Sequence, residues 1–595
     1  MWSCQDFLEE PSDVSGQTES VVFSTIETAE QVLAAPYSSL PWGWPCLNGA
    51  GPWSQGILIY FAPISCASDE ADTALEGGYN FVHPNYHEGL LTANTIDPYR
   101  EDKWDYDWFA IRNAWYFYDK VDMVNDGTPQ SYINQRKAEA LGLVAQRYYE
   151  MFKRYGGLPW IDHYITMGES VDMSRMSISR TVDSICSLLD RAIAMPDLPE
   201  RNAVNEFGRV NKVALRMLKA RVLLWSASPL FNPEDNQSYY PSFDKQELIK
   251  HETYDKNRWQ EAADACLEAI NAAHGAGYAL YTKYGDPVRD YKAAVTEFPD
   301  IDASGTAKGN PEIIWGTRPA DSYASETYQS GSRVTIWSTL KQLRGTVGTY
   351  LIPLQNMVDK YELLNGSDQP SDYWQTTSDP YNNLDRRFNA TIYHHGYSLG
   401  KNIGPFILDM RMEPAGDQYP NGNQAFTGYY LAKFFDDDYI AGLGNYPQAF
   451  WPYMRLSDLY LMYAEALNEV DYTSNSGEIL HYVNLVRNRA GQPNLENKPG
   501  FQATQAYVRE CIRKERIVEL AYEDQIYFDY KRWKVADKYI GGNMYGMKIT
   551  GDMTNPTFSK FLYETRVWSS KWYLFPLYQK DVLTTNGVLA QNPGW

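Results

Sequence analysis

The pattern of apolar positions predicts a mainly helical chain. Its clearest case is residues 451–470, where Leu, Tyr, Ala and Val recur at intervals of three and four and therefore share one face of a helix. Tyr, Met and Ala widen that face until little polar surface is left, which is typical of a helix buried between others. Ser457 and Asp458 suit its first turn as a cap and as a charge that the helix dipole favours. We therefore expect this helix to be the central piece of a helical scaffold.

The same spacing predicts helices on both sides of this central one. They cover residues 23–35, 103–124, 135–155, 181–194, 209–228 and 257–273, and later residues 479–490 and 504–533. Small alanines in 209–228 and 257–273 would allow close packing of helix pairs, as in tetratricopeptide units, although no strict repeat of about 34 residues is visible.

Residues 275–450 have a different character. Gly, Pro, Asp, Ser and Tyr are frequent, helical patterns are short, and residues 313–317 and 391–393 are typical of brief strands. We expect three parts: an N-terminal helical part (1–274), a loop-rich insertion with short strands (275–450) and a C-terminal helical part (451–595). Together they should form one compact unit, mainly α.

The charge and the cysteine content argue against some classes of partner and site. The chain has 75 acidic against 53 basic residues, a formal charge of −22, and no basic run, so a nucleic acid partner is not expected. The six cysteines form no CxxC and have no zinc spacing with histidine. Pairing of Cys46 with Cys66 is left open. No run reaches the ~18 apolar residues of a membrane-spanning helix.

Aromatic residues are unusually abundant, at 15% of the chain. Rings beyond the needs of a core tend to serve recognition, and flat rings suit the apolar faces of sugars. Many of them lie in long aperiodic loops, 41–53 and 66–99, of a kind that is usually functional. The candidate ligand-binding residues are Trp42, Trp44, Trp53, Asp69, Asp72, Tyr79, Phe81, Tyr86, Tyr323, Tyr328, Trp337, Arg387 and Tyr393.

Stacking a sugar on one such ring would bury ~50–100 Å² of apolar surface, worth roughly 1–2 kcal/mol. Carboxylates such as Asp69 and Asp72 can orient hydroxyls by hydrogen bonds, and Arg387 can donate to two neighbouring hydroxyls. The structural alternative, that a ring only packs its own loop, should hold for about half of the aromatic candidates.

Catalysis has little support in the sequence. Glu515 and Glu519 lie one helical turn apart, as acid–base pairs can, but the surrounding arginines favour structural ion pairs. There is no GxSxG and no HExxH motif.

No metal site is expected at the histidine pairs. His394 and His395 are adjacent, so their rings should diverge, and Pro84 argues against a helix that would align His83 with His87. Residues 300–311 begin like a calcium loop, but Pro311 stands where the last carboxylate ligand is needed. A polar turn is the preferred interpretation there, with a structural calcium left open and no other cofactor expected.

Several stretches resemble the SusD/RagB family, the surface lipoproteins of Bacteroidota. In chain order they are CQDFLEEP after residue 3, SDEAD (68–72), the Trp104 to Ala114 run, ALRMLKARVLLWSASP (214–229), RLSDLYLMYAEALNE (455–469), VNLVRNRAGQP (483–493), IRKERIVELAYEDQIYFDYKRW (512–533) and the terminal QNPGW. Each motif is degenerate alone, but their succession over nearly the whole chain is specific.

This resemblance implies a scaffold of tetratricopeptide-like helix pairs and a protein that binds without catalysing. It implies capture of an oligosaccharide and its delivery to a SusC-type TonB-dependent transporter, over which the protein sits as a lid. Cys4 would carry a lipid anchor on the extracellular face of the outer membrane; the expected signal segment before it is either truncated or mis-started here, so this expectation rests on the position of that cysteine.

Three alternatives remain open from the sequence. The first is a peptide-binding member of the RagB type, which the acidic charge mildly favours for cationic peptides. The second is a glycoside hydrolase that uses two of the many carboxylates. The third is a structural lid whose ligand contacts come mostly from the transporter.

Overall fold

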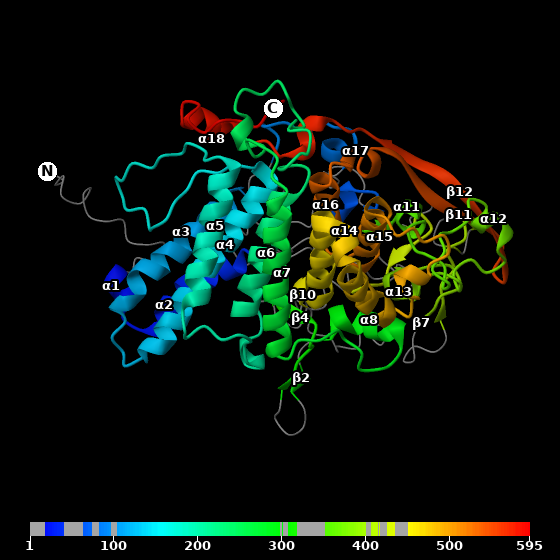
Figure 1. Ribbon diagram of the computed structural model, residues 1–595, viewed down its shortest axis with the longest axis horizontal. Helices are drawn as coiled ribbons and strands as arrows, with labels where there is room; N and C mark the ends of the chain where they lie inside the picture. The colour runs from blue at the N-terminus through cyan, green and yellow to red at the C-terminus, as the bar shows by residue number, and fades with distance from the viewer. Residues whose placement is uncertain are drawn as a thin grey trace.

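The computed structural model shows two groups of helices lying side by side, with the loop-rich insertion beside and beneath the second group (Figure 1). It describes residues 18–40, 64–73, 83–96, 104–297, 300–301, 307–317, 351–399, 406–413, 416, 425–434 and 450–595. Within these ranges, none of the helices has the length and the apolar character needed to cross a membrane.

The first group is formed by the N-terminal helices, each of which packs against the next from α2 to α7. These pairs stack in chain order (Figure 1), which confirms the predicted tetratricopeptide-like scaffold. The helices are α1 (Glu19–Val22), α2 (Ile26–Ser38), α3 (Trp104–Lys120), α4 (Gln130–Tyr155), α5 (Ile178–Ala194), α6 (Lys212–Ala227) and α7 (Asn257–Gly275).

Local sequence explains where several of these helices begin. The side chains of Thr25, Ser177 and Asn211 accept the free N–H groups in the first turns of α2, α5 and α6. The alanines of α6 and α7, such as Ala220 and Ala269, are fully buried, and these two helices pack against each other as expected.

The central helix is α14 (Leu456–Arg489), which packs against α7 and α15. A non-helical residue, Asp471, with φ −173° and ψ 104°, divides it into the two predicted helices. Nearly every residue from 456 to 467 is buried, which confirms its place between other helices.

Residues 451–455, at the start of the stretch expected to contain this helix, form strand β10 (Trp451–Arg455), and the helix begins at Leu456. Proline at 452 disfavours a helical conformation at Trp451, because its ring clashes with the preceding residue. The extended segment pairs antiparallel with β4 (Ile313–Thr317), the strand that the sequence predicted at the same residues.

The predicted helix over residues 504–533 is wrong as a single element. α15 (Gln505–Glu519) and α16 (Ile526–Arg532) are separated by Tyr522 and Asp524, whose φ angles of 62° and 58° are left-handed. Side chains of L-residues make that conformation costly, and no α-helix continues through it. The Tyr522 N–H donates instead to the buried carboxylate of Glu70 at 2.8 Å. The short helix α17 (Ala536–Tyr539) follows α16.

The insertion consists of short elements, as predicted. Its helices are α8 (Pro287–Thr296), α11 (Gln355–Val358), α12 (Tyr373–Thr376) and α13 (Arg386–Thr391). Its strands, besides β4, are β2 (Asp300–Ile301), β3 (Ala307–Lys308), β5 (Ile352–Pro353), β6 (Ile392–Tyr393), β7 (Ser398–Leu399), β8 (Phe406–Ile407) and β9 (Tyr430–Leu431). All sheets of the described chain are two-stranded; β5 pairs with β1 (Ala71–Asp72) and β6 with β9.

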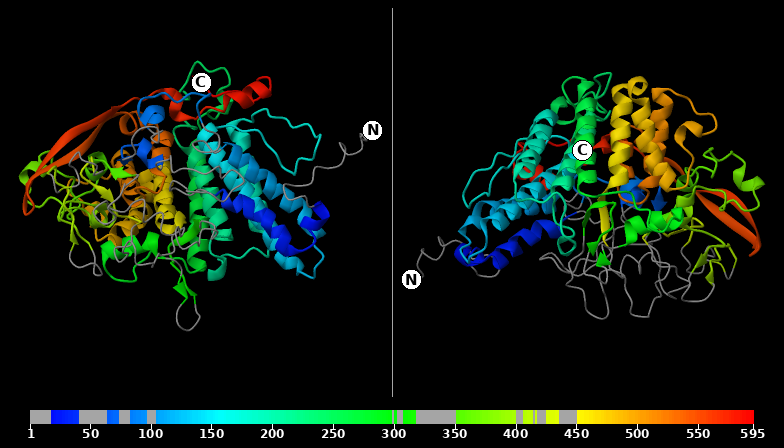
Figure 2. Two further views of the ribbon diagram at one scale, coloured as in Figure 1. Left: turned by 180° about the vertical axis from the view of Figure 1, so that it is seen from behind. Right: turned by 60° about the horizontal axis from the view of Figure 1, so that its bottom comes forward.

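The longest strands were not predicted. β11 (Gly542–Asp552) and β12 (Asn555–Arg566) form an antiparallel hairpin with a two-residue turn, Met553 and Thr554. The hairpin runs along the outside of the molecule, beside the insertion (Figure 2). After it the chain passes through η9 (Ser570–Tyr573) and α18 (Gln579–Thr584). Other single 3-10 turns are η4 (Val121–Met123), η5 (Val204–Glu206), η6 (Gln246–Leu248) and η8 (Leu495–Asn497).

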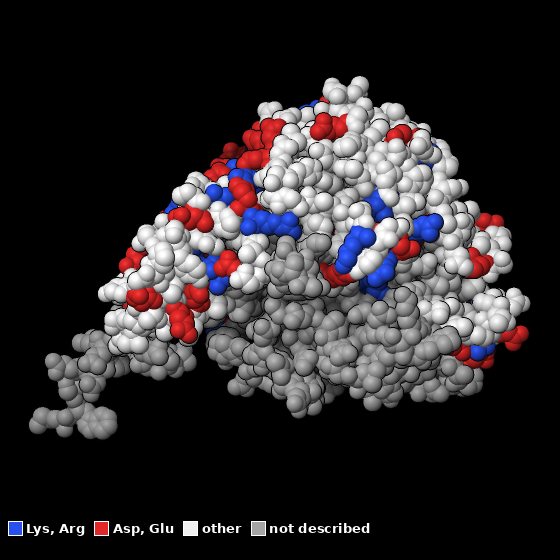
Figure 3. Space-filling view, turned by 90° about the horizontal axis from the view of Figure 1, so that it is seen from below, with Lys and Arg blue, Asp and Glu red and all other residues white. Residues whose placement is uncertain are grey.

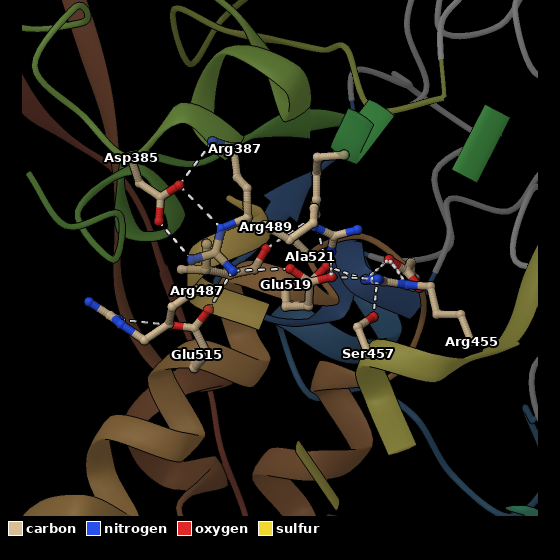
Figure 4. A network of polar contacts seen from close by, with 12 residues as sticks. Asp385, Arg387, Arg455, Ser457, Arg487, Arg489, Glu515, Glu519 and Ala521 are labelled. Carbon is tan, nitrogen blue, oxygen red and sulfur yellow. Dashed lines mark hydrogen bonds and ion pairs between the residues drawn. The ribbon is translucent and has the colours of Figure 1, made fainter. Parts of the chain in front are cut away.

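A buried network of ion pairs joins the second helical group to the insertion (Figure 4). At its centre is Glu519 of α15, which is fully buried. It accepts hydrogen bonds from Arg387 at 3.0 Å, from Arg455 at 2.5 Å and from Arg489. Burial alone would raise the pKa of Glu519, but the three guanidinium groups hold it well below its usual value.

The network extends beyond Glu519 to further carboxylates. Arg455 also binds Glu312, just before β4, at 2.9 Å and Glu523 at 2.8 Å. Glu515 binds Arg387 at 2.6 Å and Arg487 at 2.9 Å. The expected structural ion pairs of Glu515 and Glu519 therefore form, but with arginines that lie far away in the sequence.

Removing the central carboxylate should destabilise the fold strongly. In Glu519→Gln, three buried guanidinium groups lose their shared anion, and breaking a buried ion pair from one side typically costs about 3–5 kcal/mol. Glu510→Gln is the control, since Glu510 is exposed on the same helix and its ion pair with Arg513 at 3.1 Å is a surface contact worth about 0–1 kcal/mol. Urea and thermal unfolding measure both variants. Equal stability of the two would contradict this description of the network.

Stability should also fall at acid pH because of a buried histidine between α5 and α6. Both ring nitrogens of His251 lie 2.9 Å from serine hydroxyls, of Ser179 and Ser226. Burial, aided by Arg258, lowers the pKa of His251 to about 3. The unfolded chain binds this proton near pH 6.5, so the stabilisation is present above that pH and is lost as the pH falls toward 3, by up to about 1.4 kcal/mol per pH unit.

Comparing the pH dependence of stability in the wild type and in His251→Gln gives the contribution of this histidine alone. The stability advantage of the wild type should shrink between pH 6.5 and pH 4 in thermal unfolding. His481→Gln, at an exposed position of α14, serves as the control. An advantage of His251 that stays constant over this range would contradict the assignment.

Candidate functional site

The structure describes five of the thirteen candidate ligand-binding residues: Asp69, Asp72, Tyr86, Arg387 and Tyr393. Trp42, Trp44, Trp53, Tyr79, Phe81, Tyr323, Tyr328 and Trp337 lie outside the described residues, as does the predicted lipidation site Cys4. So do residues 302–306 of the calcium-like segment.

Arg387 and Tyr393 lie inside the protein and not on an exposed loop. The Arg387 guanidinium is bound by Asp385 at 2.7 Å in addition to Glu515 and Glu519. Tyr393 is fully buried in β6, where its ring contacts Tyr397. Arg387 was expected to donate hydrogen bonds to ligand hydroxyls, but its N–H groups donate to carboxylates of the protein instead. Asp385 is a neighbour in the sequence LDRRFNATIY, whereas Glu515 and Glu519 come from a distant helix.

Asp69 and Asp72 are also buried, in the segment that runs from η1 (Ile64–Ala67) into β1. Asp69 accepts hydrogen bonds from Lys360 at 2.5 Å and from Tyr530 at 2.9 Å. Between the two aspartates, burial raises the pKa of Glu70 to about 8. The hydrogen bonds of Asp69 therefore connect residues 64–72 to Tyr530 of α16 and to Lys360 of the insertion. Cys66, in η1, is a free, buried thiol whose pKa is raised well above its usual value by burial.

The structure brings Asp72 and Tyr86 close to two histidines. Residues His83–His87 form one turn of π-helix, η3, so the expectation that Pro84 excludes a helix here is wrong. Proline is tolerated in a first helical turn because its missing N–H would have no partner there. The ring centroids of His83 and His87 lie 4.6 Å apart. The half-buried ring of Tyr86 packs edge-on against Phe575, with 6.4 Å between their centroids.

His83 and His87 both face acidic side chains. His83 Nε2 lies 2.9 Å from Asp72 Oδ1, and His87 Nδ1 lies 3.2 Å from Glu564 Oε2 of β12. Burial lowers the pKa of His83, but the Asp72 carboxylate outweighs this and raises it overall. The pKa of His87 is lowered, first by burial and then by the Arg566 guanidinium. Two imidazoles and two carboxylates are a set of groups that can hold a divalent metal ion.

Glu564 and Arg566 were missed by sequence analysis. Their strand was not predicted, and they lie near the other end of the chain from His83 and His87, so no local pattern links them. The spacing of the two histidines was a usable signal, but it was set aside because of Pro84.

A shallow hollow of about 410 Å³ lies beside α18 and is lined by Asn94, Tyr578, Lys580, Leu583 and Thr584. It offers a single aromatic ring. On the face seen from below, acidic and basic side chains are interspersed over the described surface (Figure 3), so the described part of that face presents no continuous basic surface for a polyanion.

Comparison with known proteins finds similarity to SusD proteins. Residues 311–595 match the model of the SusD family. SusD-like protein P2 of Formosa agariphila is 28% identical over 170 residues, which are 28% of this chain and 30% of that relative. The aligned part therefore spans less than a third of the length of that relative.

Solved structures share the fold over nearly the whole chain. A SusD-like protein from Bacteroides fragilis has 22% identity and a TM-score of 0.75, with 99% of this chain and 100% of that chain covered. A SusD-like carbohydrate binding protein from the same species has 19% identity and a TM-score of 0.69, covering 94% and 98% of the two chains.

Surface glycan-binding protein A from Bacteroides thetaiotaomicron, in complex with laminarihexaose, has 16% identity and a TM-score of 0.57, covering 96% of this chain and 99% of that chain. Together, the family match in the C-terminal half and the shared helical fold confirm the resemblance read from the sequence motifs. Residues 311–595 are therefore identified as SusD-like, and the fold of the whole chain is that of SusD-like proteins.

Proposed function

We propose that this protein binds an extracellular oligosaccharide at the cell surface and delivers it to a SusC-type TonB-dependent transporter. The observation that carries the proposal is the fold shared with a surface glycan-binding protein that was solved with laminarihexaose. The aromatic content of the chain, with 47 Tyr, 18 Trp and 22 Phe, supports a sugar ligand.

In the proposed mechanism, rings in the loops form platforms for the apolar faces of the sugar. Trp42, Trp44 and Trp53, together with Tyr79 and Phe81, are the first candidates. Hydrogen bonds from neighbouring polar groups would set the orientation of the chain of sugars. The described helices and the ion network would supply a rigid base for these loops, so that little conformational entropy is lost when the ligand binds.

Binding without bond cleavage is favoured by the state of the paired carboxylates. A glycoside hydrolase needs an acid and a base that reach the sugar. Glu515 and Glu519 are buried and bound by arginines, and the pKa of Glu519 is held low, which does not suit a proton donor. The family resemblance, together with a lipid anchor at Cys4, would place the protein on the extracellular face of the outer membrane.

The proposal predicts that single ring removals weaken glycan binding. In affinity electrophoresis through gels that contain one polysaccharide each, including fructans and α- and β-glucans, one polymer should retard the protein. Trp42→Ala, Tyr79→Ala or Trp337→Ala should each reduce the affinity about 5- to 30-fold, the equivalent of roughly 1–2 kcal/mol of lost stacking. Tyr254→Ala, which removes a partly exposed ring outside the predicted loops, should change nothing.

Other results would redirect the proposal. If no polymer retards a folded protein but a protein digest competes for binding, the ligand is a peptide. If retardation appears only with the transporter present, the site is completed by that partner. Release of reducing ends from any polysaccharide would contradict the proposed mechanism of binding without cleavage.

A further inference from the structure

Four side chains from three separate elements converge beside the β11–β12 hairpin. They are Asp72 of β1, His83 and His87 of η3, and Glu564 of β12. One nitrogen or oxygen atom from each lies within 4.8 Å of those of the other three. Asp72 and His87 are buried, whereas 32% of the His83 side chain and 17% of the Glu564 side chain are exposed, so the cluster borders on solvent.

The environment of His87 is the strongest evidence that a cation belongs there. Its Nε2 lies 2.8 Å from the carbonyl oxygen of Cys66, which can only accept, so this nitrogen carries the proton. In the neutral ring, Nδ1 then carries a lone pair. That lone pair faces Glu564 Oε2 at 3.2 Å and Asp72 Oδ1 at 3.9 Å.

In this tautomer the buried nitrogen makes no hydrogen bond with either oxygen, because a lone pair and a carboxylate oxygen are both acceptors. A lone pair turned toward two carboxylate oxygens is repelled by both of them, unless a positive charge lies between. A metal ion would satisfy all three groups at once. The bond from Nε2 to a backbone carbonyl is also the usual way in which proteins fix the tautomer of a metal-binding histidine.

The spacing suits a small ion with four ligands. A tetrahedral Zn²⁺ at about 2.0–2.1 Å from each ligand separates its ligand atoms by about 3.3 Å. The separations here are 2.9 Å between His83 Nε2 and Asp72 Oδ1, 3.2 Å between His87 and Glu564, and 3.9 Å between His87 and Asp72. These three separations lie within about 0.6 Å of that value, so modest side-chain shifts would bring these pairs to the metal geometry.

Arg566 lies next to the cluster but leaves its ligand atoms available. Its Nε binds Glu564 Oε1 at 2.5 Å, so Oε2 still faces His87. Its two terminal nitrogens donate to the carbonyls of Ser68 and Ala71, and Nη2 is 3.8 Å from Asp72. The guanidinium thereby orients Glu564, as groups behind a metal ligand commonly do, and offsets one of the two negative charges.

We propose that Asp72, His83, His87 and Glu564 bind one divalent transition-metal ion, with Zn²⁺ as the best match. Two imidazole and two carboxylate ligands suit zinc and its neighbours, whereas Ca²⁺ and Mg²⁺ prefer oxygen ligands alone. With all four positions taken by protein, the site is structural and not catalytic. The ion would tie β1 and η3 to β12 and would hold together the two ends of the segment between Asp72 and His83.

The test uses the full chain after treatment with a chelator and dialysis. Titration with ZnCl2 by isothermal calorimetry should show one equivalent bound, and Zn²⁺ should raise the thermal unfolding temperature. Equal concentrations of Ca²⁺ or Mg²⁺ should do neither. Co²⁺ in place of zinc should give the visible absorption of a four-coordinate ion.

Substitutions of three of the four proposed ligands test whether Zn²⁺ binds at this cluster. His83→Ala, His87→Ala and Glu564→Gln should each weaken Zn²⁺ binding at least about tenfold and abolish the Co²⁺ absorption. The matched control is His163→Ala, because His163 also lies between two carboxylates, Asp162 at 2.8 Å and Glu169 at 2.6 Å, but on the surface and, among the described residues, outside any four-ligand cluster. That variant should keep the single equivalent.

The proposal is overturned if the folded chain shows no saturable Zn²⁺ binding, since His87 is then an imidazolium paired with Glu564. It is equally overturned if binding persists unchanged in His83→Ala and Glu564→Gln. Should His87→Ala fail to fold, these two variants still decide, because their side chains are partly exposed and tolerate replacement more readily.

Discussion

The fold depends on the burial of one negative charge, Glu519, among three arginines. A carboxylate without water must be compensated, and the compensation comes from Arg387 in the insertion and from Arg455 and Arg489 at the two ends of α14. These ion pairs therefore form only when the insertion packs against α14 and α15. In this way they fix part of the loop-rich insertion to the helices.

The periodic parts of the chain could be predicted from the sequence, because helical spacing is a local signal. α4, α6, α7 and both halves of α14 appear close to where the apolar pattern placed them. The break between α15 and α16 could not be predicted, since it depends on Glu70, a residue far earlier in the chain, accepting the Tyr522 N–H. The β11–β12 hairpin was missed because its residues lack a regular alternation of buried and exposed positions.

The candidate site could be predicted only in part, for the same reason. Residue types indicate which side chains are chemically capable of binding, but their burial and their partners depend on distant segments. Arg387 illustrates this, because its position in a loop-like sequence suggested ligand contact, while Glu515 and Glu519 bind it from another part of the chain. His83 and His87 show the converse. Their spacing was visible, but Glu564, which completes the cluster, is contributed by a strand almost at the end of the chain.

The described helices thus form a base that buried ion pairs stabilise, and the proposed recognition residues lie in segments that the sequence predicts to be loops. Hydrogen–deuterium exchange, with and without a pool of oligosaccharides from fructans and from α- and β-glucans, tests this division most directly. The account predicts slower exchange on binding in residues 41–53, 74–82 and 318–337, and unchanged exchange in α4 and α14. Exchange that stays the same everywhere with sugars, but slows with a pool of peptides, would contradict it.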